Sequence, residues 1–457
     1  MPGILQSAGR EAPHLPIAGA MGPFLSPPSR GEEKDRPALR LCFLVVLALL
    51  AFSAAPALAA PDLPPGVRLI DGYIPRFEQK RRMDAAYGYQ LDELRKQIIK
   101  RGNDGENLPC SSQILEETDW LIGSTGDTAR IERRLADLRA SLQRTPEQQA
   151  PAGRQTPSDG SWGECYEAWF LRMHASADPL KELVERGGKP AHKLDFLKEV
   201  DSPQKIVERF RKLRISRVLE DGLDNRKELN LTVTGLGQLL FLPRLAGLFP
   251  PDWPRGDVAA ALIGFMDSEW QDPETGYWGA WYQVGDRLIK TEDLSVTFHI
   301  ASYRDGRIDR LPQLVRTTFR TRERAYPYGW QDRGSQNCHH AYDVVRLVRF
   351  GWPHMSDKQK AFARAQLVII LARTIRLAIN SVGEVDARPY NRVAEAYYFC
   401  TSLLDDIGYF RRSRNFWSAL EFDDADDLRI RMLAQLKHLP QDDPMVDAAR
   451  RKLEARD

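Results

Sequence analysis

The sequence predicts an all-α fold, and three observations support this class. Apolar residues recur at helical spacing over most of the chain from about residue 75 onward, as with Ile131, Leu135 and Leu138 in an otherwise charged segment. The alternation typical of half-buried strands is nearly absent. One motif occurs twice with the same frame, "QTPSDGSWG" at 155–163 and "QDPETGYWG" at 271–279. Such a recurrence indicates a repeated structural unit.

The N-terminus predicts an export signal rather than part of the fold. The apolar run Leu41–Ala60 ends in a small-x-small pattern at Ala59, so we expect residues 1–59 to be a signal peptide with an extended N-region. A transmembrane anchor is the alternative, because the run is about long enough to span a bilayer. The cleavage pattern favours a periplasmic or secreted protein without stable membrane insertion. The true start, Met1 or Met21, stays open.

Composition narrows the class of protein further. The chain has 457 residues, of which 42% are hydrophobic, which is enough for a large core. A net charge of +2 offers no strong field for nucleic acid, so we expect no nucleic-acid partner. After signal removal four cysteines remain, and export permits disulfides between them. Their pairing cannot be read from the sequence; they are Cys110, Cys165, Cys338 and Cys400.

The order of elements divides the mature chain into two parts. Residues 60–150 form an expected N-terminal helical arm and linker, because helices with polar faces end at the stretch "PEQQAPAGRQTPSDG". Residues 151–457 form the main domain. Its predicted helical segments are about 163–176, 179–187, 203–219, 227–248, 255–270, 291–303, 311–323, 338–350, 356–380, 390–411 and 425–437.

The repeated motif combines residues that suit a tight turn between helices. Gly276 and Gly279 permit close backbone beside the indole of Trp278, and Gln271 can satisfy free backbone groups at a helix end. Over residues 155–410 the chain resembles α/α-toroid proteins, through the glutamine–tryptophan motif of terpenoid cyclases and the Gly-x-Trp loops of toroidal polysaccharide enzymes. This resemblance implies an (α/α) toroid, a barrel of helical hairpins whose inner helices begin beside a central cleft.

The strongest candidate site is the stretch "YPYGWQDRGSQNCHHAYDVV". It resembles the Asn/His/Tyr cluster of toroidal uronate lyases, in which such groups polarise a carboxyl group and transfer protons. His339 and Asp343 are four residues apart and share a helix face. The alternative is a structural helix start with packed histidines. The resulting candidates are Asn337, His339, Tyr342 and Asp343 for catalysis, with Tyr328 and Trp330 as substrate-binding aromatics.

A second candidate group follows the second copy of the motif. Trp278, Trp281 and Tyr282 are expected to stack on sugar rings. Asp293 begins a helix, and with Asp343 it would form the carboxylate pair of a glycoside hydrolase. His299 lies on an apolar stretch and is expected to be a core histidine.

Two further patterns have simpler structural alternatives. Arg388, Tyr390 and Arg392 begin another helix, and arginine suits a bidentate grip on a carboxylate or sulfate, although surface salt bridges explain them equally. The acidic run Asp423–Asp427 matches motifs of terpene cyclases and prenyl-diphosphate enzymes. We expect it to be a solvated helix start.

These observations favour an exported glycan-degrading enzyme, specifically a polysaccharide lyase that acts on a uronate-containing polysaccharide. A glycoside hydrolase, a non-catalytic glycan-binding envelope protein and an isoprenoid cyclase are the alternatives, with the cyclase least favoured. No metal-ligand spacing and no nucleotide fingerprint occurs, so no cofactor and no metal are expected. The sugar, its linkage and the oligomeric state stay open.

Overall fold

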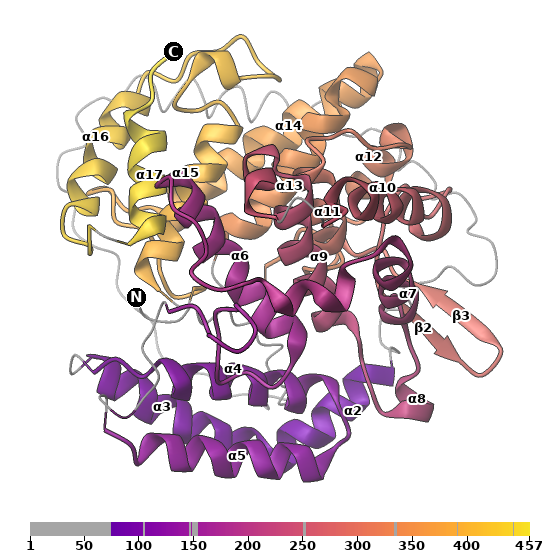
Figure 1. The fold of residues 1–457 in the computed structure, drawn as a ribbon. Helices are drawn as coiled ribbons and strands as arrows, with labels where there is room; N and C mark the ends of the chain where they lie inside the picture. Colours follow the sequence, from indigo (N-terminus) through magenta and orange to yellow (C-terminus); the bar gives the residue numbers. More distant parts are fainter. Residues whose placement is uncertain are drawn as a thin grey trace, which may run out of the picture.

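The computed structural model describes residues 75–103, 106–145, 148, 154–249, 253–332, 336–390, 392–441 and 443–457. Helices dominate these residues, so the predicted all-α class is confirmed (Figure 1). The predicted signal segment, residues 1–59, lies outside them. Across the described ranges, no helix combines the length and apolar character needed to cross a membrane.

The first described helices form a small bundle at one end of the molecule (Figure 1). They are α2 (Pro75–Met83), the π-helix η1 (Asp84–Gly88), α3 (Tyr89–Asn103), α4 (Pro109–Ser124) and α5 (Thr128–Leu142). Helices α4 and α5 pack along each other over buried Leu115, Leu121 and Leu135. Asp127 caps α5 by accepting a hydrogen bond from the amide of Arg130.

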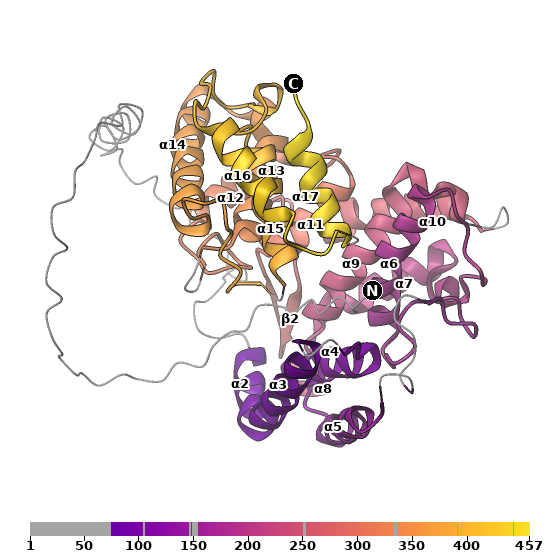
Figure 2. The same cartoon turned by 90° about the vertical axis from the view of Figure 1, so that its left-hand side faces the viewer.

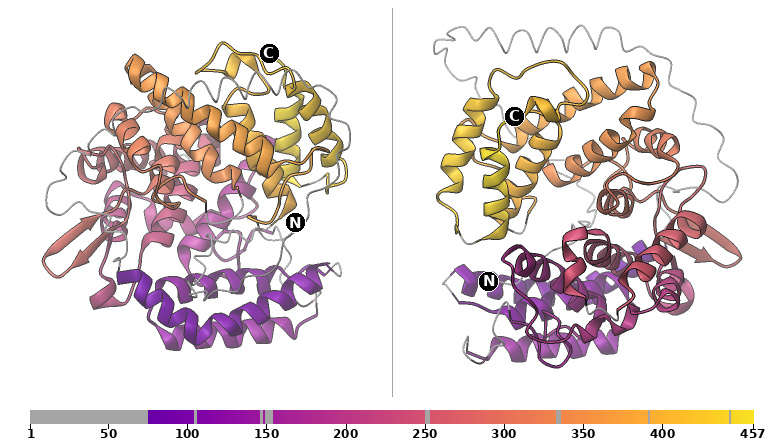
Figure 3. Two further views of the ribbon diagram at one scale, coloured as in Figure 1. Left: turned by 180° about the vertical axis from the view of Figure 1, so that it is seen from behind. Right: turned by 45° about the horizontal axis from the view of Figure 1, so that its top comes forward.

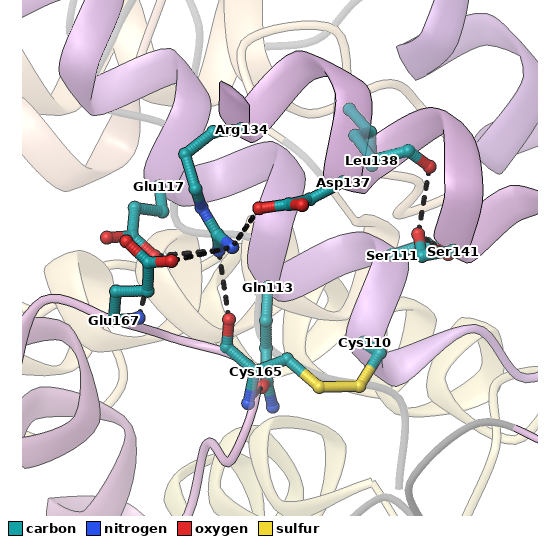
Figure 4. The surroundings of a disulfide bond; sticks show 10 residues. All are labelled: Cys110, Ser111, Gln113, Glu117, Arg134, Asp137, Leu138, Ser141, Cys165 and Glu167. Carbon is teal, nitrogen blue, oxygen red and sulfur yellow. Dashed lines mark hydrogen bonds and ion pairs between the residues drawn. A yellow bond between two sulfur atoms is a disulfide. The ribbon is translucent and has the colours of Figure 1, made fainter. Parts of the chain in front are cut away.

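A disulfide and a buried ion pair fasten this bundle to the chain that precedes the next helix (Figure 4). Cys110 at the start of α4 is bonded to Cys165. The guanidinium of Arg134 donates to Glu117 at 2.8 Å and to the carbonyl of Cys165 at 2.9 Å. Glu117 also accepts from two backbone amides just after Cys165, at 2.9 and 3.0 Å. Because the carboxylate is buried, the loss of one of these partners would leave an uncompensated charge between the bundle and the chain that follows it.

Six helices then follow one another in space in chain order. They are α6 (Trp169–Glu185), α9 (Arg226–Phe241), α11 (Leu294–Tyr303), α13 (Cys338–Gly351), α15 (Val393–Asp406) and α17 (Pro444–Glu454), and each packs against the next. In the right-hand view of Figure 3 this succession follows an arc from the magenta part of the chain to the yellow part. A second disulfide, Cys338–Cys400, joins α13 to α15.

A second set of helices alternates with the first along the chain. It comprises α7 (Pro203–Leu213), α10 (Arg255–Phe265), α12 (Leu311–Arg320), α14 (Asp357–Arg373) and α16 (Ala425–Leu436). Helix α10 packs on α7 and α9, α12 and α14 pack on α13, and α16 packs on α17. Figure 2 shows α14 at the edge of the molecule. The main domain is therefore built from two alternating helix sets.

The remaining elements are short. Strands β1 (Ile215–Ser216), β2 (Trp281–Val284) and β3 (Arg287–Lys290) form a sheet in that order, with β1 parallel and β3 antiparallel to β2. The short helices are α8 (Val218–Asp221), the 3-10 helices η3 (Asp195–Val200), η4 (Pro243–Leu248), η6 (Trp352–His354) and η8 (Arg412–Arg414), and the π-helices η5 (Met266–Trp270) and η7 (Thr374–Ala378).

Some element boundaries differ from the sequence-based expectation. The segments expected at 163–176 and 179–187 form the single helix α6, which continues through Pro179. Ala177 and Leu180 beside this proline are buried, so core packing outweighs the cost of an interior proline.

The β2–β3 hairpin and helix α17 are absent from the sequence-based prediction. Helix α17 buries only Val446, Ala449 and Leu453, which are too few apolar positions to stand out from the charged residues around them. The hairpin lies between the predicted helical segments 255–270 and 291–303, where the prediction placed no element.

The two copies of the repeated motif have the same turn geometry. The amide of Gln155 donates to the carbonyls of Gly160 and His192, both at 2.8 Å. Gln271 does the same toward Gly276 and Asp309, at 3.0 and 2.9 Å. The glycine that accepts from the glutamine has positive φ in both copies, 72° at Gly160 and 70° at Gly276. The predicted equivalence of the copies is thus confirmed.

The tryptophans of the two copies differ in burial. The backbone amide of each donates to a hydroxyl of the helix that follows, Trp162 to Ser176 in α6 at 2.8 Å and Trp278 to Thr297 in α11 at 3.1 Å. Trp278 is fully buried, but Trp162 is only half-buried. Trp278 therefore packs in the core, whereas Trp162 is partly exposed.

A tighter glycine turn precedes α15 and lacks both signature side chains. Gly383 has φ 86°, and its amide donates to the carbonyl of Asn380, three residues back, at 3.1 Å, whereas Gly160 and Gly276 each donate to the carbonyl four residues back. A Cβ at Gly383 would lie 2.7 Å from the backbone of Arg431 in α16, as close as the corresponding approach at Gly276. Because this segment lacks Gln and Trp, the repeated sequence pattern does not predict the turn.

Candidate functional site

One large cavity lies between the N-terminal bundle and the six successive helices. Its volume is about 1700 Å³, and its wall includes residues of α4, α6, α9, α11, α13, α15 and α17. Among the described residues, none from the second helix set lines it. Five histidines and six tyrosines of the described residues do. They are His174, His192, His299, His339, His340, Tyr166, Tyr303, Tyr326, Tyr342, Tyr390 and Tyr398. The cavity therefore concentrates groups that transfer protons and groups that stack on rings.

The start of α13 places Asn337 and His339 at this cavity. Asn337 is the N-cap, and its Oδ1 accepts a hydrogen bond from the amide of His339 at 2.9 Å. The His339 ring stacks on Phe399 of α15, with 4.0 Å between ring centroids. Burial, reinforced by His340 and His299, lowers the pKa of His339 well below its usual range. His339 is therefore neutral at neutral pH and able to accept a proton.

Asp343 lies behind this wall rather than on it. The carboxyl group is fully buried and accepts a hydrogen bond from the hydroxyl of Tyr326 at 2.8 Å. Its other oxygen is 3.8 Å from Nε2 of His339. Burial raises the pKa of Asp343 well above its usual range. Asp343 therefore contacts two residues that line the cavity, Tyr326 and His339, but does not line the cavity itself.

Tyr326 also contacts a second histidine. Its ring stacks on His340 with 3.5 Å between centroids, and Nδ1 of His340 lies 2.6 Å from Asp332. Tyr326, His340 and Asp332 all line the cavity. A carboxylate that orients an imidazole beside a tyrosine is an arrangement suited to proton transfer.

Tyr342 lies one turn into α13 and lines the same wall. Its hydroxyl accepts a hydrogen bond from Arg346 at 3.1 Å. Burial, with the nearby carboxylate of Asp406, raises the pKa of the Tyr342 hydroxyl above its usual range. Tyr342 therefore stays protonated at neutral pH, and it can donate a proton more readily than it can accept one.

Of the residues predicted to bind a carboxylate before α15, only some line the cavity. Tyr390 and Arg392 line the cavity, and Arg392 pairs with Asp443 at 2.8 Å. Arg388 is exposed, pairs with Asp386 at 2.7 Å and does not line the cavity. The carboxylate-binding role predicted for Arg388 is therefore unsupported, whereas Arg392 is in position for it.

Asp293 is a structural residue in this arrangement. It is the N-cap of α11, where it accepts from the amide of Val296 at 3.1 Å. It is fully buried and forms a two-fold ion pair with Arg226, at 2.6 and 3.0 Å. Asp293 does not line the cavity, but Arg226 does. The carboxylate pair Asp293–Asp343, predicted for a hydrolase, is therefore not presented to a ligand.

Most of the predicted sugar-stacking aromatics lie in the core. Trp278, Trp281, Tyr282 and Tyr328 are each buried and none lines the cavity. Trp278 donates from its indole to the carbonyl of Met266 at 2.9 Å, which fixes it inside the turn. Trp330 lines a separate pocket of about 220 Å³. Their bulk serves packing, so the substrate contacts predicted for these residues are not available in this structure.

His299 is placed differently from the expectation of a core histidine. It is half-buried and lines the cavity, and its ring stacks on Tyr303 with 5.8 Å between centroids. Burial, with His174 and Arg226 nearby, lowers the pKa of His299 to about 3. The apolar residues around it in the sequence face the core, and they concealed its position.

The sequence-based prediction did not include the part of the cavity wall that is formed around α4. Glu116 and Asp119 of α4, Tyr166 of the loop before α6 and Lys227 of α9 line the cavity together. They are separated by up to about a hundred residues in the chain, so no local pattern joins them. Only the packing of the bundle against α9 brings them to one surface.

The described residues contain no metal cluster that would indicate a function, and the comparisons with known proteins found no match. Within the described ranges, no three His, Cys, Asp or Glu side chains gather as a metal site. No protein-family model, curated protein or solved structure matches this chain.

Proposed function

We propose that this chain is an exported glycan-degrading enzyme, a polysaccharide lyase that acts on a uronate-containing polysaccharide. The observation that carries the proposal is the wall at the start of α13, where Asn337, a neutral His339 and a protonated Tyr342 line one large cavity. A base, an acid and an amide within one wall are the groups that β-elimination beside a carboxyl group requires.

Each of these groups has a distinct part in the proposed reaction. The amide of Asn337, or Arg392 across the cavity wall, polarises the uronate carboxyl. His339 removes the proton on C5, and the electron pair of that bond forms the C4–C5 double bond as the C4–O bond breaks. The leaving oxygen takes a proton from Tyr342, and the histidinium afterwards restores the tyrosine. His339 rather than Tyr342 is the base, because burial keeps the imidazole unprotonated and the phenol protonated.

The fold and the compartment form part of the same proposal. We infer that the two alternating helix sets are the inner and outer helices of an α/α toroid, because one set lines the cavity and the other does not. Export is supported by the two disulfides, Cys110–Cys165 and Cys338–Cys400, which persist in oxidising compartments. Cell fractionation with N-terminal sequencing would test this, since the mature chain should begin near Ala60.

The alternatives have less support at the cavity. The hydrolase version loses its predicted carboxylates, because Asp293 and Asp343 are buried away from the wall. The acidic run of the cyclase version, Asp423–Asp427, lies at the start of α16 with its carboxylates exposed and outside the cavity. A glycan-binding protein without catalysis is an outcome of the following experiment.

The mature protein should be tested on acidic and neutral polysaccharides. A lyase creates a double bond that absorbs in the ultraviolet, a hydrolase produces reducing ends without it, and a binding protein retards the glycan without shortening it. We expect ultraviolet-absorbing products from a uronate polymer only. Reducing ends without absorbance, or retardation alone, would replace the proposal with the corresponding alternative.

His339→Ala tests the assignment of the base. We expect turnover to fall by ~10²-fold or more, while the free energy of unfolding changes by no more than about 1 kcal/mol, because the ring lines the cavity and does not belong to the hydrophobic core. His354→Ala is the matched control, since His354 is exposed on η6 outside the cavity. Unchanged turnover per folded molecule would remove His339 from the mechanism.

A further inference from the structure

Glu116 on α4 is a buried acid that faces the cavity and that the proposed reaction does not use. Its side chain belongs to the cavity wall although the residue is only 5% exposed. The hydroxyl of Tyr166 donates a hydrogen bond to Oε2. A buried carboxyl with one neutral partner requires an explanation, because burying an uncompensated charge is costly.

The neighbouring residue, Glu117, is a carboxylate with a purely structural role, and it serves as a comparison for Glu116. Glu117 is fully buried, and it is paired with Arg130 and Arg134 and with two backbone amides. Glu116 has no such set of partners, although both residues belong to the same turn of α4. The interaction network that fastens α4 to the main domain therefore does not account for Glu116.

Lys227 supplies a positive charge at the same wall. It projects from α9, lies 3.7 Å from Asp119 and is close enough to Glu116 to attract it. Asp119 is one turn from Glu116 and also pairs with Arg95 at 2.8 Å. A protonated Glu116 thus offers an O–H donor beside an ammonium group. An ionised Glu116 would instead repel an anion and compete with it for Lys227.

The protonation of Glu116 is balanced near neutral pH. Burial raises its pKa to about 7, against the opposing effects of Lys227 and of the hydrogen bond from Tyr166, while Asp119 and Glu117 raise it further. A carboxylic acid kept neutral by its surroundings can donate a hydrogen bond to a bound anion.

We propose that Glu116, Tyr166 and Lys227 form a second subsite of the cavity, which binds the carboxylate of a uronate residue when Glu116 is protonated. The inference rests on the proposed function, because it takes the ligand to be an acidic glycan. Protonated Glu116 donates its O–H to the carboxylate, Tyr166 holds the other oxygen of Glu116 in place, and Lys227 neutralises the charge. The glycan therefore contacts α4 as well as the α13 wall.

The experiment measures the affinity for an oligogalacturonate by calorimetry as a function of pH. His339→Ala serves as background so that turnover does not interfere. Because only the protonated fraction binds, the dissociation constant should rise about tenfold between about pH 6 and about pH 8. Glu116→Gln keeps an oxygen for Tyr166 to donate to and cannot ionise, so its affinity should lose most of this pH dependence. The remainder would come from Lys452, which lines the same cavity and whose pKa burial lowers to about 8. Lys227→Ala should weaken binding at every pH.

Two controls isolate the subsite. Glu132→Gln alters an exposed glutamate that accepts a hydrogen bond from Tyr87 at 2.9 Å, a similar pair outside the cavity, and should leave the pH dependence unchanged. The carboxyl-reduced oligosaccharide should bind without pH dependence. His174 also faces Lys227, but burial lowers its pKa, so it stays neutral over this range.

The outcomes separate this inference from the proposed function. If the oligogalacturonate binds and Glu116→Gln retains the pH dependence of the parent, the subsite is overturned while the proposed function stands. If the wild-type chain neither binds nor cleaves any acidic glycan, both are overturned. A parallel measurement of KM against pH in the wild-type background should show the same rise, with little change in kcat.

Discussion

Four buried carboxyl groups illustrate how their neighbours, rather than their residue type, decide their roles. Glu117 and Asp293 are each held by arginine and backbone amides, and both serve to join helices. Asp343 and Glu116 each accept a hydrogen bond from one tyrosine hydroxyl, and burial raises the pKa of both. The second kind is suited to a functional site, because its protonation can respond to a ligand.

The raised pKa of Glu116 predicts a pH dependence of stability that needs no substrate. The pKa is about 7 in the folded chain against an ordinary value of 4.5. The folded state therefore holds this proton more tightly, and the resulting stability is fully present below about pH 4.5 and is lost as pH rises to about 7. Its size is on the order of 3 kcal/mol. In Glu116→Gln this loss should vanish.

Chemical denaturation of Glu116→Gln and wild type at about pH 5 and about pH 8 checks this prediction. The variant should gain relative to wild type at the higher pH only. Glu132→Gln, which alters the exposed pair with Tyr87, should follow wild type at both values. A constant difference between Glu116→Gln and wild type would show that Glu116 titrates normally.

The two repeated turns, at residues 155–163 and 271–279, anchor their loops to the neighbouring helices. In both copies a glutamine amide binds two carbonyls, a glycine takes positive φ, and the backbone amide of the tryptophan binds a helix hydroxyl. These contacts explain why the pattern combines Gln, Gly and Trp. The tryptophan ring fills the core in one copy and is half-exposed in the other, so the backbone turn is the shared feature.

Glycine substitutions test this turn directly. A Cβ at Gly160 would lie 1.9 Å from the carbonyl oxygen of Lys193, and one at Gly276 would lie 2.6 Å from the backbone nitrogen of Leu314. Gly160→Ala and Gly276→Ala should therefore destabilise the chain by more than the ~1–2 kcal/mol of positive φ alone. Gly187→Ala is the matched control, because its φ is 71° with no atom near the added Cβ. Denaturation midpoints that are equal for all three variants would contradict the close approach.

At the scale of the whole molecule, the N-terminal bundle contributes to the wall of the cavity. Helix α4 supplies one wall, and the Cys110–Cys165 disulfide links it to the loop that carries Tyr166. The second disulfide, Cys338–Cys400, joins α13 to α15 behind His339. Each bond therefore fixes a different wall of one cavity.

Replacing both cysteines of one disulfide with serine should loosen only the cavity wall that this disulfide supports. The sequence separations are 55 and 62 residues, so loss of either bond should cost a similar ~2–4 kcal/mol. Hydrogen exchange should rise in α4 when Cys110 and Cys165 are replaced, and in α13 and α15 when Cys338 and Cys400 are replaced. Equal exchange throughout the chain in both variants would show that the walls do not loosen independently.

The sequence by itself determined the helical class, because apolar periodicity is a local property, and it identified the two full turns, because their contacts require particular residues at fixed spacing. It also located Asn337, His339 and Tyr342, since a cap and the first turn of a helix lie within a few residues of one another. It could not distinguish a core tryptophan such as Trp278 from a sugar-binding one, because the two have the same composition and differ only in what surrounds them.

The tertiary structure alone decided which groups share the cavity. Glu116 and Lys227 lie 111 residues apart by their numbers, and His174, His299 and His339 come from three different helices. Asp293 and Asp343 appear equivalent in the sequence, yet packing turns the first toward Arg226 and the second toward Tyr326. The physical reason is that burial and neighbouring charge set both the direction and the protonation of a side chain, and those depend on helices brought together from distant parts of the chain.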